Sequence, residues 1–412
     1  MRPLAVMEIA KRTEPGAARF LRQQKWPRKK NIQHTEKKSL LHYILDMSIF
    51  EKKEKTPSQT VVDDVCKIKK GEKVLIIANP ETSYISQELY KAALEAGAKP
   101  VLAYQPKKTS GDFCEESVVG AIKSEPDVIF SISEIKLGKD EKAIQTPYEI
   151  DGKTFDNTFD YLLNGKKTIR AVWTPGLTED MYNRTVNIDY KKLAENCATL
   201  CRKFENAQSV HVTAPGGTDI TIGLTDRAGM VDDGDFSKPG TGGNIPAGET
   251  FISPVVGTSE GVIVYDGSMT FSDGDAILET PISCKVEKGF ITDITGGEEA
   301  KRLLKDITQA EKDSVKMEES GKLPKGQGAI YAKNARNIGE LGIGLNPAAN
   351  ITGNMLEDEK AFRTCHFAVG ENYDGDAPAL IHFDGVVREP TIIIKYADGT
   401  ETTVLENGDL KL

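Results

Sequence analysis

The chain has 412 residues, a length that suggests two or three domains. Apolar residues make up 39% of the sequence and charged residues 28%, which excludes a wholly fibrous or wholly disordered protein. The net charge is −9, and no apolar run approaches the roughly 18 residues of a membrane span, so we expect neither nucleic acid nor membrane as a partner.

The first 55 residues carry the opposite charge to the rest of the chain. They hold 14 Lys or Arg against 6 Asp or Glu, and their apolar residues show little periodicity. We therefore predict a basic, disordered extension over residues 1–56, of which residues 1–46 pack little against the rest. The extension also lacks the apolar core of a secretory signal.

Residues 57–205 alternate short β-branched runs with helical patterns. Strands are predicted at residues 73–78, 100–104, 127–132 and 169–173, and helices at residues 83–96, 115–123 and 190–204. This alternation is typical of βαβ crossovers, so we predict an N-terminal α/β domain with a parallel sheet. The turn after the first strand contains no glycine, and a nucleotide phosphate loop is therefore not expected there.

From residue 206 the strands become shorter and turn signals more frequent. Strands are predicted at residues 209–213, 219–224, 261–265, 282–286, 290–294, 391–396 and 401–405, with a helix at 299–318. An Asp-Gly turn at 398–399 joins the last two strands as a hairpin. We predict an antiparallel-rich α+β domain over residues 206–412, which makes the fold class α/β plus α+β. The acidic run 232–235 is interpreted as a solvated turn.

Six cysteines are scattered through the chain without any Cys-x-x-Cys pair. Cys197 and Cys201 share one face of a predicted helix, but their spacing is not that of a zinc ligand pair. A chain with this cysteine usage and no secretory signal is typical of a cytoplasmic protein with reduced thiols, and that is the location we expect.

The residues best suited to chemistry lie near the C-terminus. His382 and Asp384 are two apart on a predicted strand, so they point to the same face and can converge on one cation. His366 lies in a second strand-like segment, and Glu340 lies between glycines that allow close approach of the backbone. Nitrogen and oxygen ligands of this kind suit Zn²⁺, Co²⁺, Mn²⁺ or Fe²⁺.

The order of these motifs resembles the M29 metallopeptidases, the group of aminopeptidase T and aminopeptidase S. The resemblance covers approximately residues 60–412 and is strongest in the C-terminal half. It is carried by the segments 340–347 and 355–360, by His366, by the His-x-Asp pair at 382–384, and by a Pro-x-Gly-Glu segment at 246–249.

The resemblance implies a two-metal site with six ligands. Carried over one at a time, these ligands fall on Glu249, Glu340, His366, Tyr373, His382 and Asp384. The metals implied are two divalent ions, Zn, Co or Mn. Within this set Glu340 is the candidate bridging ligand or general base, and Tyr373 is either a ligand or a group that stabilises the oxyanion. The resemblance also implies a homodimer that acts on small peptides.

The function predicted from these residues is a metal-dependent aminopeptidase, a hydrolase in which two cations activate a water molecule for attack on the scissile carbonyl. The alternative is an Fe(II)-dependent, ring-cleaving dioxygenase of the dihydroxypyridine type on the same scaffold. In that case His366, His382 and Asp384 would supply the two histidines and one carboxylate that hold the iron. A third hypothesis is a binding protein without catalysis, against which the intact ligand set argues.

Overall fold

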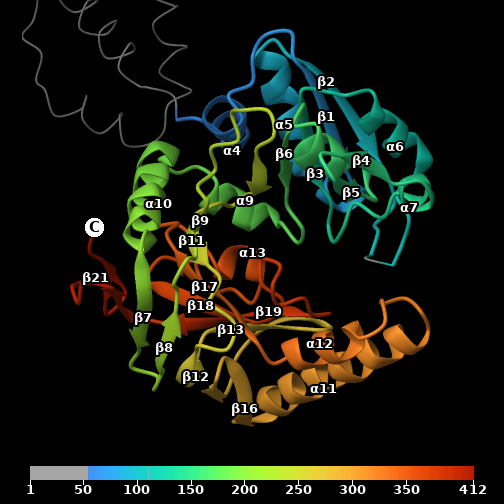
Figure 1. The fold of residues 1–412 in the computed structure, drawn as a ribbon. Helices are drawn as coiled ribbons and strands as arrows, with labels where there is room; N and C mark the ends of the chain where they lie inside the picture. The colour runs from blue at the N-terminus through green and yellow to red at the C-terminus, as the bar shows by residue number, and fades with distance from the viewer. Residues whose placement is uncertain (1–53, 110) are drawn as a thin grey trace, which may run out of the picture. The chain divides into compact units, whose positions relative to one another are not determined.

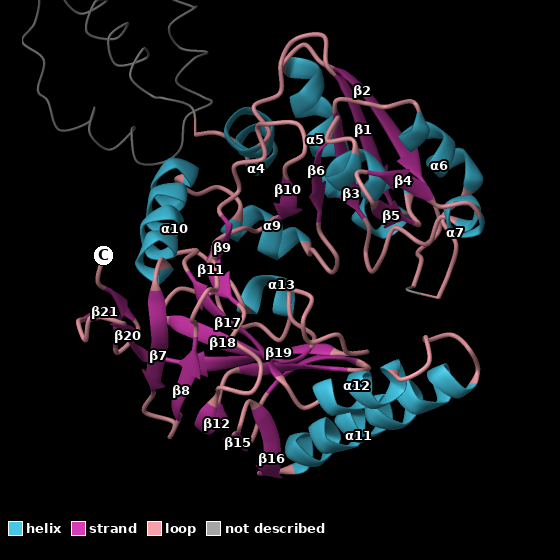
Figure 2. Cartoon of the chain, viewed as in Figure 1, coloured by secondary structure: helices cyan, strands magenta, loops and turns pink. Residues whose placement is uncertain are grey.

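The computed structural model describes residues 54–412 with the exception of residue 110 (Figure 1 and Figure 2). The predicted extension therefore lies, as far as residue 53, outside the described residues, as does the prediction that residues 1–46 pack little against the rest. Residues Lys55–Leu412 form one compact unit. Among the described helices, none is both long and apolar enough to cross a bilayer.

A parallel sheet of five strands forms the first layer, as predicted from the sequence. Its strands lie in the order β10–β6–β3–β1–β2, and all neighbours pair in parallel. Their bounds are β1 Lys73–Ala78, β2 Lys99–Tyr104, β3 Val128–Ile132, β6 Arg170–Trp173 and β10 Gly242–Asn244. Strand β10 comes from beyond residue 205, where the sequence analysis placed the domain boundary, so the second half of the chain returns to extend this sheet.

Helices fill the connections of the parallel sheet, and α5 and α6 lie beside it in Figure 2. The helices of this half are α4 Pro57–Thr60, α5 Ser83–Glu95, α6 Glu116–Lys123, α7 Glu141–Gln145, α8 Thr158–Asp160, α9 Glu179–Thr185 and α10 Tyr190–Phe204. Further helical turns span Val61–Val65, Pro80–Thr82 and Tyr161–Gly165, and a small hairpin pairs β4 Tyr148–Ile150 with β5 Lys153–Phe155.

The helix predicted at residues 190–204 is present as α10, and its capping and apolar spacing explain why it forms. The side chain of Asp189 caps its first turn by accepting a hydrogen bond from the Lys192 amide, which satisfies one of the free backbone donors there. The helix then buries Leu193, Cys197 and Leu200 along one face, the spacing that a 3.6-residue period requires.

Two antiparallel sheets make up the second half. The larger has the order β16–β15–β12–β8–β7–β20–β21–β22, with bounds β7 Ala207–Thr213, β8 Asp219–Gly223, β12 Glu260–Tyr265, β15 Ile282–Glu287, β16 Phe290–Thr295, β20 Thr391–Tyr396, β21 Glu401–Glu406 and β22 Asp409–Leu410. The predicted strands in this region and the hairpin between β20 and β21 are confirmed. Helices α11 Glu298–Glu319 and α12 Gln327–Asn334 pack side by side.

The seven-stranded sheet has the order β14–β13–β19–β18–β17–β11–β9. Its strands are β9 Met230–Asp232, β11 Glu249–Ile252, β13 Ser268–Phe271, β14 Gly274–Ile277, β17 Ile338–Gly344, β18 Thr364–Gly370 and β19 His382–Arg388, and helix α13 spans Met355–Asp358. Figure 1 shows that β11, drawn in yellow, lies beside the red strands of the C-terminal segment. The sheet thus joins segments that are far apart in the sequence.

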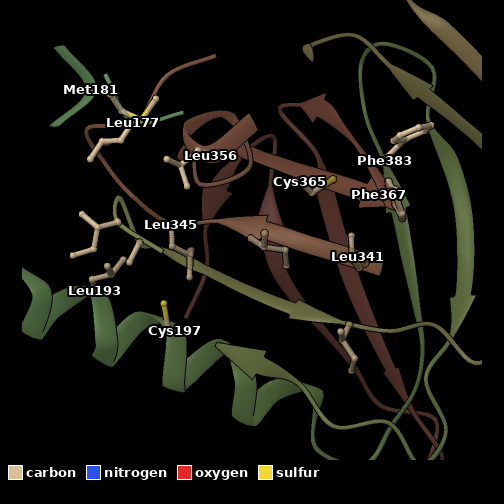
Figure 3. Close-up of a cluster of buried hydrophobic side chains, with 14 of the residues drawn as sticks. Leu177, Met181, Leu193, Cys197, Leu341, Leu345, Leu356, Cys365, Phe367 and Phe383 are labelled. Carbon is tan, nitrogen blue, oxygen red and sulfur yellow. The ribbon is translucent and has the colours of Figure 1, made fainter. Parts of the chain in front are cut away.

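One face of the seven-stranded sheet belongs to the hydrophobic core. Leu341 on β17, Phe367 on β18 and Phe383 on β19 are buried there, and Figure 3 shows them in one cluster with side chains of α9 and α10. Because successive residues of a strand point to opposite faces, the residues between them face the other side of the sheet. The core face therefore fixes which residues form the site described below.

Candidate metal centre

Five of the six predicted ligands lie on one face of four adjacent strands. Glu249 begins β11, Glu340 lies on β17, His366 on β18, and His382 and Asp384 on β19. The pairing register aligns them. Glu340 and Asp384 both lie opposite Ala368 of β18, and His366 lies opposite Gly342 of β17. The structure thus brings together residues that are up to 135 positions apart in the chain.

Two local features of β17 create the room for this arrangement. The register shifts between Ile338 and Glu340, and a bulge of this kind changes the face to which the following residues point. Gly342 lies two residues after Glu340 and points to the same face of the sheet. A Cβ added at Gly342 would lie 2.0 Å from His366 Nε2. Only a glycine therefore leaves space for the imidazole to lie across β17.

The carboxylate of Glu340 lies between the two histidines. Its Oε1 is 3.0 Å from His366 Nε2, and its Oε2 is 3.6 Å from His382 Nε2. His366 Nε2 is also 3.4 Å from Glu249 Oε2, and His382 Nε2 is 3.4 Å from Asp384 Oδ1. The other ring nitrogen of His382 is 2.9 Å from the carbonyl oxygen of Glu371, a contact that orients the ring with Nε2 towards the cluster.

These side chains form overlapping groups of possible metal ligands. One group consists of Glu249, Glu340 and His366, and another of Glu340, His382 and Asp384; within each, the ligand atoms lie within 4.8 Å of one another. A third group combines Glu359 with His366 and Asp384. Each group contains one histidine and two carboxylates, and Glu340 is shared by the first two.

A buried lysine lies next to the cluster. The side chain of Lys360 is 0% exposed, and its Nζ donates to Glu249 Oε1 at 2.9 Å and to the carboxylate of Glu359. Asp232 Oδ2 lies 3.8 Å from the same ammonium. The carboxylates raise the pKa of Lys360 well above its usual range although burial acts in the opposite direction, so the lysine is a fixed positive charge.

The charges of the cluster do not balance. The cluster holds five carboxylates for this one lysine, namely Asp232, Glu249, Glu340, Glu359 and Asp384. With all five ionised and both histidines neutral, as metal ligands would be, four negative charges would remain, which is the charge that two divalent cations would neutralise. The imbalance also affects the histidines. Burial alone would lower their pKa values, but the carboxylates outweigh it and raise the pKa of His366 to about 9 and that of His382 to about 10.

The pKa values of two carboxylates of the cluster are shifted in opposite directions. Burial raises the pKa of Glu359 to about 7, with Lys360 acting against this shift. Burial alone would also raise the pKa of Asp384, but the positive charge of His382 outweighs it and lowers this pKa to about 2. Asp384 is therefore a permanent carboxylate, whereas Glu359 can exchange a proton near neutral pH.

The ligand atoms fit a cation because several of them lack other partners. Glu249 Oε2 and Asp384 Oδ1 are buried without a hydrogen-bond partner among the described residues, as is Asp232 Oδ1. A buried carboxylate oxygen without a partner is costly, and a cation with nitrogen and oxygen ligands would satisfy it.

Tyr373, the sixth predicted ligand, lies at the rim. Its side chain is 61% exposed. The ring centroid lies 5.3 Å from that of His382 and 5.2 Å from that of Phe251. The structure therefore places this tyrosine beside the cluster, in reach of a bound molecule, rather than among the buried carboxylates. The metal-ligand roles of all six residues stay predictions.

Three members of the cluster were not predicted from the sequence. The interpretation of Asp232 as part of a solvated turn is wrong for this residue, because Asp232 ends β9 and pairs with Glu249. Glu359 and Lys360 were part of a recognised motif but received no role. The signal that could have identified them is a lysine placed directly after three acidic residues, 357–359, ahead of a buried strand.

The buried lysine leads to a prediction about stability. Lys360→Met removes the buried ammonium next to Glu249, so we expect the free energy of unfolding of the metal-free protein to fall by about 3–5 kcal/mol. Zn²⁺ or Mn²⁺ should then stabilise the variant more than the parent protein. Urea unfolding in the presence of a chelator and of metal measures both effects.

The matched control is Lys395→Met, which breaks an exposed ion pair with Glu401 and should cost at most about 1 kcal/mol. A Lys360→Met variant as stable as the parent in chelator would show that the ammonium does not compensate the carboxylates.

The glycine under the imidazole leads to a second prediction. In Gly342→Ala the new methyl group would displace His366 from Glu340 and Glu249, so we expect metal affinity to fall about 10–100-fold. Isothermal titration with Mn²⁺ or Zn²⁺ measures it. Gly120→Ala is the control, because an added Cβ there meets nothing within 4 Å. Equal affinities of the two variants would exclude His366 from the metal centre.

Comparison with known proteins finds similarity to 2,5-dihydroxypyridine dioxygenases and to AmpT. A family profile described as NicX, 2,5-dihydroxypyridine 5,6-dioxygenase, matches residues 178–411. The 2,5-dihydroxypyridine 5,6-dioxygenase of Pseudomonas putida is 30% identical over 161 residues, which are 38% of this chain and only 39% of that relative.

Two solved structures share the fold. The 2,5-dihydroxypyridine dioxygenase from Pseudomonas putida KT2440 has a TM-score of 0.60 and 19% identity, over 86% of this chain and 96% of that one. AmpT from Thermus thermophilus has a TM-score of 0.57 and 17% identity, over 86% of this chain and 98% of that one. The resemblance to M29 aminopeptidases is thus confirmed for the fold.

The family match extends over more than half of the chain and includes every residue of the cluster. Both related groups share the mixed architecture of a parallel sheet and antiparallel sheets. On this evidence the chain belongs to the NicX family, whose description is 2,5-dihydroxypyridine 5,6-dioxygenase.

Proposed function

We propose that this protein is a hydrolase that uses two divalent cations, Zn, Co or Mn, to remove the N-terminal residue from small peptides. The observation that carries the proposal is the position of Glu340, whose two carboxylate oxygens face different histidines in two ligand groups. A shared carboxylate suits a pair of cations better than a single one. With neutral histidines and ionised carboxylates the cluster would carry four negative charges, which two divalent ions would balance.

In this proposal Glu249, Glu340 and His366 hold one cation, and Glu340, His382 and Asp384 hold the other. When bound, such a pair supplies Lewis acidity to the scissile carbonyl and to the attacking water. Because Glu340 belongs to both groups, it would be the ligand that two cations share, which leaves the role of general base to another carboxylate.

Glu359 is the carboxylate best placed for that role. It lies within reach of His366 and Asp384, and burial brings its pKa to about 7, close to the pH at which a general base is most effective. Its carboxylate accepts from Lys360, which holds it in place. Glu359 can thus take a proton from the attacking water and return it to the leaving amine.

The rim of the site suits a peptide substrate. The exposed ring of Tyr373 lies against Phe251, and together they offer an apolar wall to a substrate side chain. The Tyr373 hydroxyl can donate to the carbonyl oxygen as it gains negative charge. The same proposal includes small peptides as substrates and a homodimer, both of which rest on the M29 resemblance. It also includes a cytoplasmic location, which rests on the six cysteines without disulfide bonds.

The second candidate is an Fe(II)-dependent dioxygenase that opens a dihydroxypyridine ring. The specific observation in its favour is the description of the matching family and of the Pseudomonas putida relative. It would use His366, His382 and Asp384 on one iron. Against it, Glu249 and Glu340 would have no role, although both lie within hydrogen-bonding or ion-pair distance of His366.

Metal stoichiometry and substrate separate the two candidates. We expect two ions per chain by elemental analysis after loading with Zn²⁺, Co²⁺ or Mn²⁺, and release of free amino acid from di- and tripeptides. Glu340→Gln should lower the stoichiometry and abolish release, because both ligand groups use this carboxylate. His211→Ala should change neither, since His211 pairs with Asp219 outside the site.

The opposite result has a distinct signature. One iron per chain after anaerobic loading, with oxygen uptake on addition of 2,5-dihydroxypyridine and no peptide cleavage, would replace the hydrolase with the dioxygenase.

The role of Tyr373 can be tested by removing its hydroxyl alone. In Tyr373→Phe the ring packing is kept, so we expect turnover to fall about 10²–10³-fold, as after loss of one oxyanion donor, while metal content stays at the parental value. Tyr396→Phe is the control, because Tyr396 lies on β20 of the eight-stranded sheet and its hydroxyl donates to the carbonyl of Lys203 on α10. Lost metal would make Tyr373 a ligand, and unchanged turnover would remove it from the site.

A further inference from the structure

A separate cavity lies in the parallel sheet, at the carboxyl ends of β3 and β6. Its volume is 440 Å³, and its lining includes Ser131, Ser133 and Thr174. Open α/β sheets bind ligands outside this edge, and the volume lies within the range of small-molecule sites. The metal centre, by contrast, is built on the seven-stranded antiparallel sheet.

The place where the strand order reverses, between β1 and β3, is already filled. The side chain of Asn79 accepts from the Glu134 amide at 2.7 Å, and Thr82 Oγ1 donates to the Ile132 carbonyl at 2.7 Å. These contacts close the usual crevice. The open space therefore lies one strand further along, between β3 and β6.

The floor of the cavity is polar. Thr174 is 2% exposed, and its Oγ1 has no hydrogen-bond partner among the described residues. Ser131 and Ser133 are 4% and 3% exposed, and their hydroxyls lie 3.1 Å apart. Since only one of the two can donate to the other, a second donor remains. Buried hydroxyls that lack partners are costly, so this floor is suited to a ligand that accepts hydrogen bonds.

The wall and the mouth narrow the chemistry of that ligand. Trp173 and Phe159 line the cavity and meet edge to face, with centroids 6.2 Å apart, an arrangement that accommodates a flat ring. Lys136 and Lys139 lie at the mouth and form no salt bridge with any residue in the described part of the chain. The lining also includes one carboxylate, Asp160, so the two ammonium groups leave a net positive charge that favours an anion.

The backbone distinguishes between anions. The amides at the strand ends are already used: Glu134 donates to Asn79, Thr174 to Ser131 and Gly176 to Glu134. Phosphate sites usually rely on such free amides. The donors that the floor and the mouth offer instead are side-chain hydroxyls and the two ammonium groups, which suit the two oxygens of a carboxylate.

We propose that this cavity binds a small aromatic carboxylate, with its ring against Trp173 and Phe159 and its carboxylate between the hydroxyl floor and the two lysines. The inference goes beyond the proposed function, because none of its residues belongs to the metal centre.

Trp173 provides a direct readout. The only other tryptophan of the chain is Trp26, so the full-length Trp26→Phe protein reports on the cavity alone. Titration with benzoate should change the fluorescence of Trp173 in a saturable manner. Benzyl alcohol and benzylamine, which keep the ring without the negative charge, should bind roughly tenfold more weakly or not at all.

Two variants locate the binding. Thr174→Val and the double variant Lys136→Gln/Lys139→Gln should each weaken benzoate binding roughly tenfold, whereas Lys123→Gln, on α6, should not. His382→Ala should leave benzoate binding unchanged, which separates this cavity from the metal centre. The lysine variant tests the proposal even if Thr174→Val does not fold.

Several results would overturn the inference. They are no saturable change with benzoate, equal binding of benzyl alcohol, equal affinity in the lysine double variant, or loss of binding in His382→Ala. Tighter binding of phenyl phosphate than of benzoate would reject the carboxylate as the ligand class.

Discussion

The structure around the metal centre depends on one electrostatic constraint, the concentration of negative charge on a buried face of a β-sheet. Burial of an ionised carboxylate is costly unless it is paired, and five of them gather here around a single lysine. Such a group is stable only if further positive charge is present or if some of the carboxylates take up protons, and burial raises the pKa values of Asp232 and Glu359 in that direction. The raised pKa values of His366 and His382 show how the protein alone meets this need, and cations would meet it more completely.

The backbone gathers these carboxylates on one face because successive side chains of a β-strand point to opposite faces of the sheet. Residues such as Leu341 and Phe367 hold the strands to the core from one side, which directs their neighbours to the other. Since β17, β18 and β19 are paired with strands on both sides, the ligand positions are rigid, as a preformed site requires. The bulge before Glu340 and the missing side chain at Gly342 are the local exceptions that adapt a regular sheet to this cluster of possible metal ligands.

Much of this could be predicted from local sequence patterns. The alternation of strands and helices, the helix at 190–204 and the shared face of His382 and Asp384 all depend on periods of a few residues, and the structure has them. Asp232 could not be placed this way, because an Asp-Asp-Gly run is a common turn signal and its pairing with Glu249 is a long-range contact. Lys360 was missed for a similar reason: its partners come from three separate segments.

The fold alone does not decide the reaction, because structures named for a dioxygenase and for AmpT resemble this chain almost equally. A scaffold of this kind fixes where side chains meet, and the chemistry then follows from which side chains they are. An iron that binds oxygen needs few protein ligands and open positions, so it is suited to a site with little excess charge. Here each ligand group has two carboxylates for one histidine, and Glu340 faces both histidines. That charge distribution is the reason why we propose two cations and hydrolysis rather than a single redox metal.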